Sequence, residues 1–268
     1  MTKDLFNLSG RVVVLTGGLG LIGLNYIEAF ISQGAFVNVI DIVKKETADK
    51  ILRKKFKGDK SRIRYFRADI SDKPSLERVK KELLKKFVVI DVLINNAALT
   101  HKVEHLSKQK SKDYSFEKLK LSEWEEEIKI NLTGTMLCCQ VFGSAMKTGA
   151  SIINIASIYG AVAPDQSIYQ KGYQQPATYG VTKAGVIYLT KYLATYWGHK
   201  GIRANCLVLG GVENGQNQEF LKKYAQKTPM GRMAKPDEFN GLLLYLASDS
   251  SSYVTGSAYA VDGGWTAW

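Results

Sequence analysis

The sequence predicts a single α/β domain, built on a doubly wound parallel sheet of about seven strands flanked by helices. Short apolar runs recur seven times along the 268 residues, without the polar alternation of half-exposed strands. Continuous apolar strands are typical of a parallel sheet that helices cover on both faces. No proline-rich linker or internal repeat divides the chain, so we expect one Rossmann-type domain over residues 1–268.

The expected elements alternate along the chain. Apolar runs predict strands at Val12–Leu15, Phe36–Ile40, Ile63–Phe66, Val92–Asn95, Ile152–Ile155, Ala204–Val208 and Ala258–Val261. Helical patterns lie between them, over Leu21–Gln33, Pro74–Phe87 and Ser122–Met146.

Two long segments interrupt this alternation, a lysine-rich stretch at residues 100–121 and a proline-bracketed stretch at residues 163–176. Long loops in a compact domain are often functional. With residues 212–228, we expect them to shape a substrate pocket. The candidate substrate contacts are Tyr169, Lys171, Tyr173 and Gln175.

The composition is ordinary for a globular protein, with 45% hydrophobic and 23% charged residues. No signal-peptide pattern and no apolar stretch of about 20 residues is present, so we expect a cytoplasmic protein without membrane attachment. The spacing of Cys138, Cys139 and Cys206 does not match a metal or redox motif, so no metal site is predicted.

A net charge of +12 favours an anionic substrate or cofactor. The lysine runs lack interleaved aromatics, so we expect no nucleic-acid partner.

The first strand leads into a glycine-rich turn, Thr16–Gly23, that reads Thr-Gly-Gly-Leu-Gly-Leu-Ile-Gly. Glycines let the chain turn sharply into a helix and let its backbone approach a pyrophosphate. The helix N-terminus then offers N–H groups and the positive end of its dipole to the phosphates. No Gly-Lys-Ser/Thr follows, so the pattern predicts a dinucleotide site and not a P-loop.

The second strand ends at Asp41, eighteen residues beyond Gly23. A carboxylate there accepts hydrogen bonds from the adenosine ribose and repels a 2′-phosphate, so NAD is favoured over NADP. Lys44 and Lys45 lie close behind and would soften that exclusion.

Polar residues also follow the third and fourth strands, where open sheets bind their ligands. Asp69 and Ile70 follow the third strand, and Asn95 and Ala97 mark the end of the fourth. Asp69 is also a candidate N-cap for the helix near Pro74.

Tyr179 and Lys183 lie four residues apart in a segment with helical periodicity, so both side chains should point into one cleft. A neighbouring cation favours phenolate and would lower the tyrosine pKa, which suits proton exchange with a carbonyl or alcohol. The stripe that indicates the helix consists of Val181, Ala184, Tyr188 and Tyr192.

Two further polar residues complete a candidate catalytic set. Ser157 lies just past the fifth strand, where its hydroxyl could hold the substrate oxygen. Asn131 lies inside an otherwise apolar helix, where asparagine is unfavourable. We expect it to bind a water that relays protons from Lys183.

Together these motifs resemble the short-chain dehydrogenase/reductase family over essentially the whole chain, including Val261-Asp262-Gly263-Gly264 near the end. The resemblance implies catalytic roles for Asn131, Ser157, Tyr179 and Lys183. It also implies a homotetramer or homodimer joined partly through the helices that carry Asn131 and Tyr179. The expected cofactor-binding residues are Thr16, Gly17, Gly20, Leu21, Ile22, Gly23, Asp41, Ile42, Asp69, Ile70, Asn95, Ala97, Tyr179, Lys183, Gly210 and Val212.

Some features depart from the usual family pattern. The glycine spacing resembles that of nucleotide-sugar epimerases, Ser157 and Tyr179 are unusually far apart, and Gly210 lacks the usual preceding proline. More narrowly, the long loops, Lys191–Trp197 and the ending Gly264–Trp268 resemble oxidoreductases of flagellin glycosylation and nonulosonic (legionaminic-type) sugar biosynthesis.

The function expected from these features is NAD(H)-dependent interconversion of an alcohol and a carbonyl, on a sugar or sugar phosphate in bacterial glycan biosynthesis. Two alternatives remain: a nucleotide-sugar epimerase or dehydratase that uses NAD transiently, and a non-catalytic NAD-binding protein on the same fold.

Overall fold

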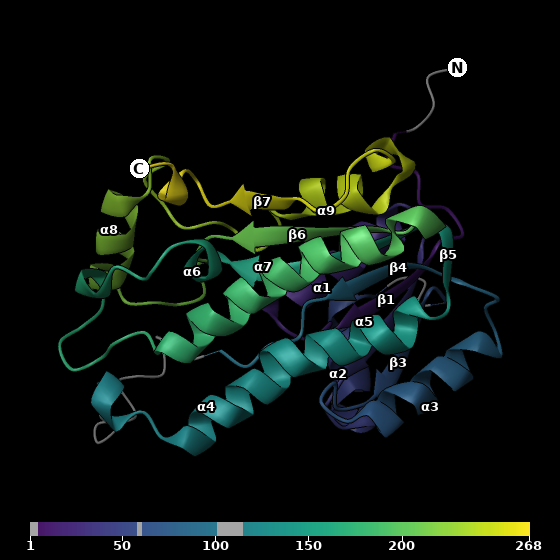
Figure 1. Cartoon of the computed structure of the whole chain (residues 1–268), viewed down its shortest axis with the longest axis horizontal. Coiled ribbons are helices and arrows are strands. Elements are labelled where there is room, and N and C mark those ends of the chain that lie inside the picture. The colour runs from purple at the N-terminus through teal and green to yellow at the C-terminus, as the bar shows by residue number, and fades with distance from the viewer. Residues whose placement is uncertain (1–4, 58–60, 101–114) are drawn as a thin grey trace.

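The computed structural model describes residues 5–57, 61–100 and 115–268. Within them, seven parallel strands form one sheet in the order β3-β2-β1-β4-β5-β6-β7 (Figure 1). This arrangement confirms the predicted doubly wound α/β fold. The strands are β1 Val12–Thr16, β2 Phe36–Asp41, β3 Ile63–Arg67, β4 Ile90–Asn95, β5 Met146–Ser157, β6 Arg203–Leu209 and β7 Ala258–Val261.

Helices cover both faces of the sheet, because successive strand residues point to opposite sides. In β1, Val13 and Leu15 face the core beneath α1, α2 and α9, while Val12 and Val14 face the core beneath α3, α5 and α7. The helices are α1 Leu21–Ser32, α2 Lys45–Lys55, α3 Lys73–Leu84, α4 Leu121–Glu127, α5 Thr135–Gly143, α6 Ile158–Ala161, α7 Ala177–Trp197, α8 Gln218–Lys227 and α9 Asn240–Ala247.

The helix predicted over Ser122–Met146 is divided into three parts, because a π-helical segment, η3 (Ile128–Gly134), separates α4 from α5. The wider turn of a π segment leaves carbonyls without their usual partners, and such segments are frequent at functional sites. Here the hydroxyl of Thr135 donates to the carbonyl of Asn131 at 2.8 Å. The helix ends at Gly143, and Met146 already belongs to β5.

A third core cluster lies at the carboxyl ends of the strands and joins three segments distant in sequence. Tyr169 and Tyr173 from residues 163–176, Phe220 and Tyr224 from α8, and Trp265 from the C-terminal turn pack together. In Figure 1, α8 and the C-terminus lie side by side. The expected loop at 212–228 is therefore wrong in part, because apolar residues at helical spacing fold 218–227 into α8.

None of the helices in the described part of the chain combines the length and hydrophobicity needed to span a membrane.

Candidate active site

Ser157, Tyr179 and Lys183 meet at the carboxyl edge of the sheet. Ser157 ends β5, and its hydroxyl hydrogen-bonds the side chain of Tyr179 from the first turn of α7. Lys183, one turn further along α7, is buried and donates from Nζ to the carbonyl oxygen of Ile155 at 2.8 Å. Its Nζ lies 5.7 Å from the centroid of the Tyr179 ring. The fold thus brings Ser157 to Tyr179 despite the long segment between them.

The protonation of this pair differs from expectation. The pKa of Tyr179 is raised to about 12, mainly by burial; the Ser157 hydrogen bond lowers it and the Glu127 carboxylate adds to the rise. Burial also lowers the pKa of Lys183 to about 8, although the charges of Cys206 and Glu127 oppose that change. The expected lowering of the Tyr179 pKa by Lys183 is therefore wrong for the free chain. The ammonium sits over the ring and bonds a carbonyl, so burial dominates.

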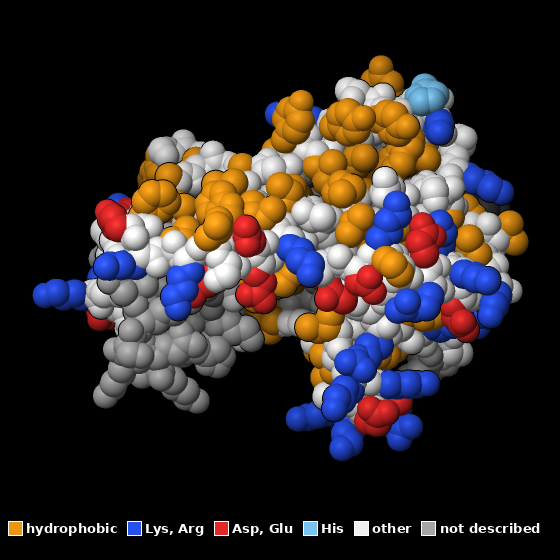
Figure 2. Space-filling model, turned by 60° about the horizontal axis from the view of Figure 1, so that its bottom comes forward, with side chains coloured by type: hydrophobic (Ala, Val, Ile, Leu, Met, Phe, Trp, Pro, Cys, Tyr) orange, Lys and Arg blue, Asp and Glu red, His pale blue; other side chains and the backbone are white. Residues whose placement is uncertain are grey.

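The stripe that indicated this helix lies on its outer side. Val181, Tyr188 and Tyr192 are 46%, 72% and 53% exposed, whereas Lys183 is 4% exposed. Figure 2 shows hydrophobic side chains gathered on the face that carries α7. The periodicity correctly predicted a helix and placed the Tyr–Lys pair on a different face, but the apolar stripe does not face the core.

Asn131 lies in the π segment and is 1% exposed. Its Oδ1 accepts from the backbone N–H of Leu99 at 2.7 Å, and its Nδ2 donates to the carbonyl of Leu99 at 3.0 Å and to Thr182 Oγ1 at 3.4 Å. The side chain therefore ties the segment after β4 to η3 and α7. The expectation that this amide binds a relay water stays a prediction, and in the free chain the amide bonds Leu99 and Thr182.

The glycine turn has the shape required to approach a phosphate. Gly17 has a φ of +63°, and a Cβ there would lie 2.6 Å from the Cα of Ala97. A Cβ on Gly23 would lie 2.5 Å from the carbonyl oxygen of Gly17. The N-cap of α1 is Gly20, and no side chain caps the helix, so the first-turn N–H groups around Leu21 and Ile22 face no capping side chain. These residues fit a dinucleotide pyrophosphate.

Asp41 lies beside this turn at the end of β2. Its carboxylate accepts from the backbone N–H groups of Leu19 at 3.2 Å and Val43 at 3.3 Å, so it is held in place. Ile42 follows and is 66% exposed, which leaves it available to a ligand.

Asp69 is exposed at the end of the segment after β3 and accepts from the N–H and hydroxyl of Ser71 at 2.8 Å. It does not cap α3, because the N-cap of that helix is Asp72. Ile70 is buried and packs next to Gly134, where a Cβ would lie 2.8 Å from its Cδ1.

The end of β4 supports the glycine turn. Thr16 Oγ1 accepts from the N–H groups of Asn96 and Ala97, each at 3.1 Å. Asn96 Nδ2 donates to the carbonyls of Thr16 and Gly17 at 3.2 and 2.9 Å. Asn96 belongs to the run Asn95–Ala98 that the sequence placed at the ligand-binding end of the fourth strand, but it was not among the expected cofactor-binding residues.

Asn95 points the other way, into the core, where its Nδ2 donates to Asn154 Oδ1 at 2.8 Å. Asn154 in turn donates to Thr190 Oγ1 at 2.8 Å, which links β4, β5 and α7. The structure thus gives Asn95 structural partners.

Gly210 and Val212 follow β6. A Cβ on Gly210 would lie 2.7 Å from the Cα of Asp262, so glycine keeps the ends of β6 and β7 close together. Val212 pairs with Ala234 in an isolated parallel bridge. Both residues follow β6 at the carboxyl edge of the sheet, and their role in cofactor binding stays a prediction.

Of the four candidate substrate contacts, Gln175 lines the larger of the two cavities described for residues 5–57, 61–100 and 115–268. Tyr169 and Tyr173 are buried, and the hydroxyls of Tyr169 and Tyr159 hydrogen-bond at 2.8 Å. Lys171 is exposed. Gln175 borders a cavity of about 570 Å³ between residues 115–123 and 163–177. Of the expected loop at 100–121, residues 101–114 lie outside the described part of the chain.

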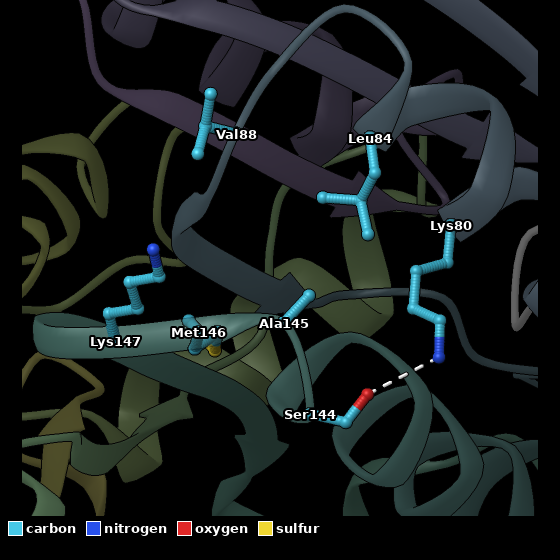
Figure 3. Close-up of a pocket in the computed structure, with 7 residues that line it drawn as sticks. All are labelled: Lys80, Leu84, Val88, Ser144, Ala145, Met146 and Lys147. Carbon is cyan, nitrogen blue, oxygen red and sulfur yellow. Dashed lines mark hydrogen bonds between the residues drawn. The ribbon is translucent and has the colours of Figure 1, made fainter.

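A smaller cavity of about 270 Å³ lies at the opposite, amino end of β5 (Figure 3). Lys80 and Lys147 border it, and Lys80 Nζ donates to Ser144 Oγ at 3.3 Å. It lies away from Tyr179. In the described residues there is no group of three His, Cys, Asp or Glu side chains that could hold a metal ion.

A dinucleotide-type turn and a Ser–Tyr–Lys cluster at one sheet edge together define a nucleotide-dependent oxidoreductase. A family model described as enoyl-(acyl carrier protein) reductase matches residues 21–266. The chain belongs to the short-chain dehydrogenase/reductase family, whose members oxidise or reduce at CH–OH groups.

Similar proteins include a D-threitol dehydrogenase from Mycolicibacterium smegmatis, 31% identical over 97% of this chain and 95% of the relative. A short-chain dehydrogenase from Leptospira borgpetersenii with bound NAD+ superposes with a TM-score of 0.84, at 31% identity, covering 99% of this chain and 97% of the other. A gluconate 5-dehydrogenase from Burkholderia cenocepacia in complex with NADP and tartrate gives a TM-score of 0.84, at 26% identity, with 99% and 98% coverage.

Proposed function

We propose that this protein interconverts an alcohol and a carbonyl on a sugar or polyol, with NAD(H) as cofactor. The observation that carries the proposal is the contact of Ser157 and Lys183 with Tyr179 at the carboxyl edge of the sheet, the same edge that carries the glycine turn. The threitol and gluconate dehydrogenases among the similar proteins support a polyhydroxylated substrate.

Each catalytic side chain has a distinct task. The bound nicotinamide would supply or accept the hydride. Since the pKa of Tyr179 is about 12, its phenol is protonated at neutral pH and can donate a proton to a carbonyl oxygen. The Ser157 hydroxyl can steady the same oxygen as charge develops on it. Lys183 stabilises the phenolate left behind while it remains an ammonium, below a pKa of about 8.

NAD is the proposed cofactor because Asp41 holds a carboxylate beside the turn. A 2′-phosphate at that position would meet a negative charge fixed by two backbone N–H groups. Similar structures contain NAD+ or NADP, so the family accommodates both.

We further propose that the protein is a homodimer or homotetramer. The exposed side chains of Tyr188, Tyr192 and Tyr196 form an aromatic face on α7, with the last two rings stacked at 5.8 Å. Exposed apolar patches of this kind mark interaction sites. Sedimentation should show an oligomer that Tyr192→Glu dissociates, and a monomeric wild type would refute this.

Four narrower assignments remain predictions. Residues 163–176 and 212–228 would shape the substrate pocket. Roles in flagellin modification or another form of bacterial glycan biosynthesis rest on resemblance, since neither the threitol nor the gluconate dehydrogenase is named for them. A cytoplasmic location is testable by cell fractionation. The epimerase or dehydratase alternative predicts a tightly retained cofactor and no net NADH release.

The decisive experiment replaces Tyr179 by Phe. Loss of the hydroxyl should lower kcat by about 10²- to 10⁴-fold with polyols, while NADH titration should give a nearly unchanged Kd. Tyr188→Phe, which removes a hydroxyl from the exposed face of the same helix, is the matched control. Turnover retained in Tyr179→Phe would disprove the catalytic assignment.

A further inference from the structure

We propose that the cavity between residues 115–123 and 163–177 is a subsite for a negatively charged group, so that the preferred substrate is a polyhydroxylated acid or phosphate. This inference rests on the proposed function and specifies its substrate class. The cavity holds about 570 Å³, within the range of small-molecule sites. In Figure 1, η2 (Phe116–Lys118) lies next to the segment that leads into α7.

The charge of this cavity is mainly positive. Lys118 and Lys120 line it, both are exposed, and neither forms an ion pair with another described residue. Glu123 is the acidic side chain among the lining residues. Two unpaired ammonium groups at the rim of a concave site raise the local concentration of anions.

Hydrogen-bond donors complete the lining. Gln175 is 8% exposed, and its Oε1 accepts from the Tyr173 hydroxyl at 3.2 Å, which orients its amide Nε2 as a donor. Gln174 is exposed on the same wall. Amide groups of this kind pair with sugar hydroxyls and carboxylates, whereas a fatty-acyl chain would leave them without partners.

The helix that carries the catalytic tyrosine begins at this cavity. Pro176 is the N-cap of α7, no side chain caps the helix, and both Pro176 and Ala177 line the cavity. The free N–H groups and the positive dipole end of this 21-residue helix add to the two lysines. Ala177 precedes Tyr179 by two residues, about 3 Å of helix rise. A substrate of several carbons reacting at Tyr179 can therefore place its far end here.

The test compares D-gluconate with D-glucitol, which differ in one carboxylate, and includes D-glucitol 6-phosphate to separate a carboxylate from a phosphate preference. Wild-type enzyme should show a KM on the order of tenfold lower for at least one anion than for the neutral polyol. Lys118→Gln/Lys120→Gln should remove that difference through KM and leave kcat for glucitol unchanged. Lys81→Gln/Lys85→Gln, which also removes two exposed lysines, at the C-terminal end of α3, is the matched control for net charge.

Equal KM values for the neutral and charged compounds, or a double variant that keeps the preference, would overturn the subsite while leaving the proposed activity intact. If none of the three compounds is oxidised, calorimetric titration in the presence of NADH decides the question. Anion binding that the double variant loses would support the subsite even though the proposed activity had failed. Absence of any anion binding would reject it.

Discussion

Substitution of Gly23 by alanine tests the cofactor site most sharply. The added Cβ would lie 2.5 Å from the carbonyl oxygen of Gly17 and 2.7 Å from the Cα of Gly18, where ordinary contacts begin at 3.4 Å. Both obstructing atoms are backbone, so the start of α1 must move away from the glycine turn. Overpacking of this kind costs about 1–3 kcal/mol. If the same free energy is lost from NADH binding, the Kd for NADH should rise by about 5- to 150-fold.

The assay is titration of NADH fluorescence, together with a thermal unfolding scan to show that Gly23→Ala still folds. Gly241→Ala is the matched control, because Gly241 lies in α9 and no atom lies within 4 Å of its added Cβ. That control should bind NADH normally and gain up to about 1 kcal/mol in stability. Wild-type NADH affinity in folded Gly23→Ala would refute the idea that the turn holds the pyrophosphate.

Two further predictions concern charges at the site. Asp41→Asn should raise kcat/KM for NADP relative to NAD by roughly tenfold, about 1.4 kcal/mol, because the fixed negative charge is gone; an unchanged ratio would argue against this role. Burial lowers the pKa of Lys183 from 10.5 to about 8, so unfolding takes up a proton between these pH values and the stability of the wild type rises across that window. The stability advantage of Lys183→Met should therefore be largest below pH 8 and shrink toward pH 10.5, by about 3 kcal/mol at most. Urea unfolding at several pH values measures it, and a pH-independent difference would contradict the buried ammonium.

The sheet was predictable because its chemistry is local. Strands β1, β4 and β6 are buried along nearly their whole length and are mostly apolar, whereas β3 and β7 at the sheet edges are only partly buried. The seven expected runs all fall inside the seven observed strands. The glycine turn was equally readable, since Gly17 needs a positive φ and Gly23 a close approach of backbone. Helix α2 was not predicted, because only Ala48 and Leu52 are buried in a segment rich in lysine.

Features that depend on tertiary partners were not predictable from periodicity. The π segment inside the expected long helix places Asn131 against Leu99, a partner 32 residues away. Helix α8 was expected as part of a loop, and its burial depends on aromatic residues from residues 163–176 and the C-terminal turn. In α7 the apolar stripe correctly indicated a helix, but the sequence could not show which side of that helix faces the core. In the structure the stripe lies on the exposed side.

The pKa values of Tyr179 and Lys183 show that the spacing of two residues in the sequence does not predict their protonation states. An i, i+4 relation places the two side chains near each other on α7, where Lys183 Nζ lies 5.7 Å from the Tyr179 ring centroid, but it does not say which atoms each side chain contacts. In the free chain Lys183 bonds the carbonyl of Ile155, and Tyr179 remains a weak acid under burial and the charge of Glu127. A neutral phenol held by Ser157 is suited to donating a proton to a carbonyl, whereas alcohol oxidation requires its phenolate. If the protein environment alone sets this pKa, reduction should be the faster direction at neutral pH, and oxidation should accelerate as pH rises until Lys183 loses its proton.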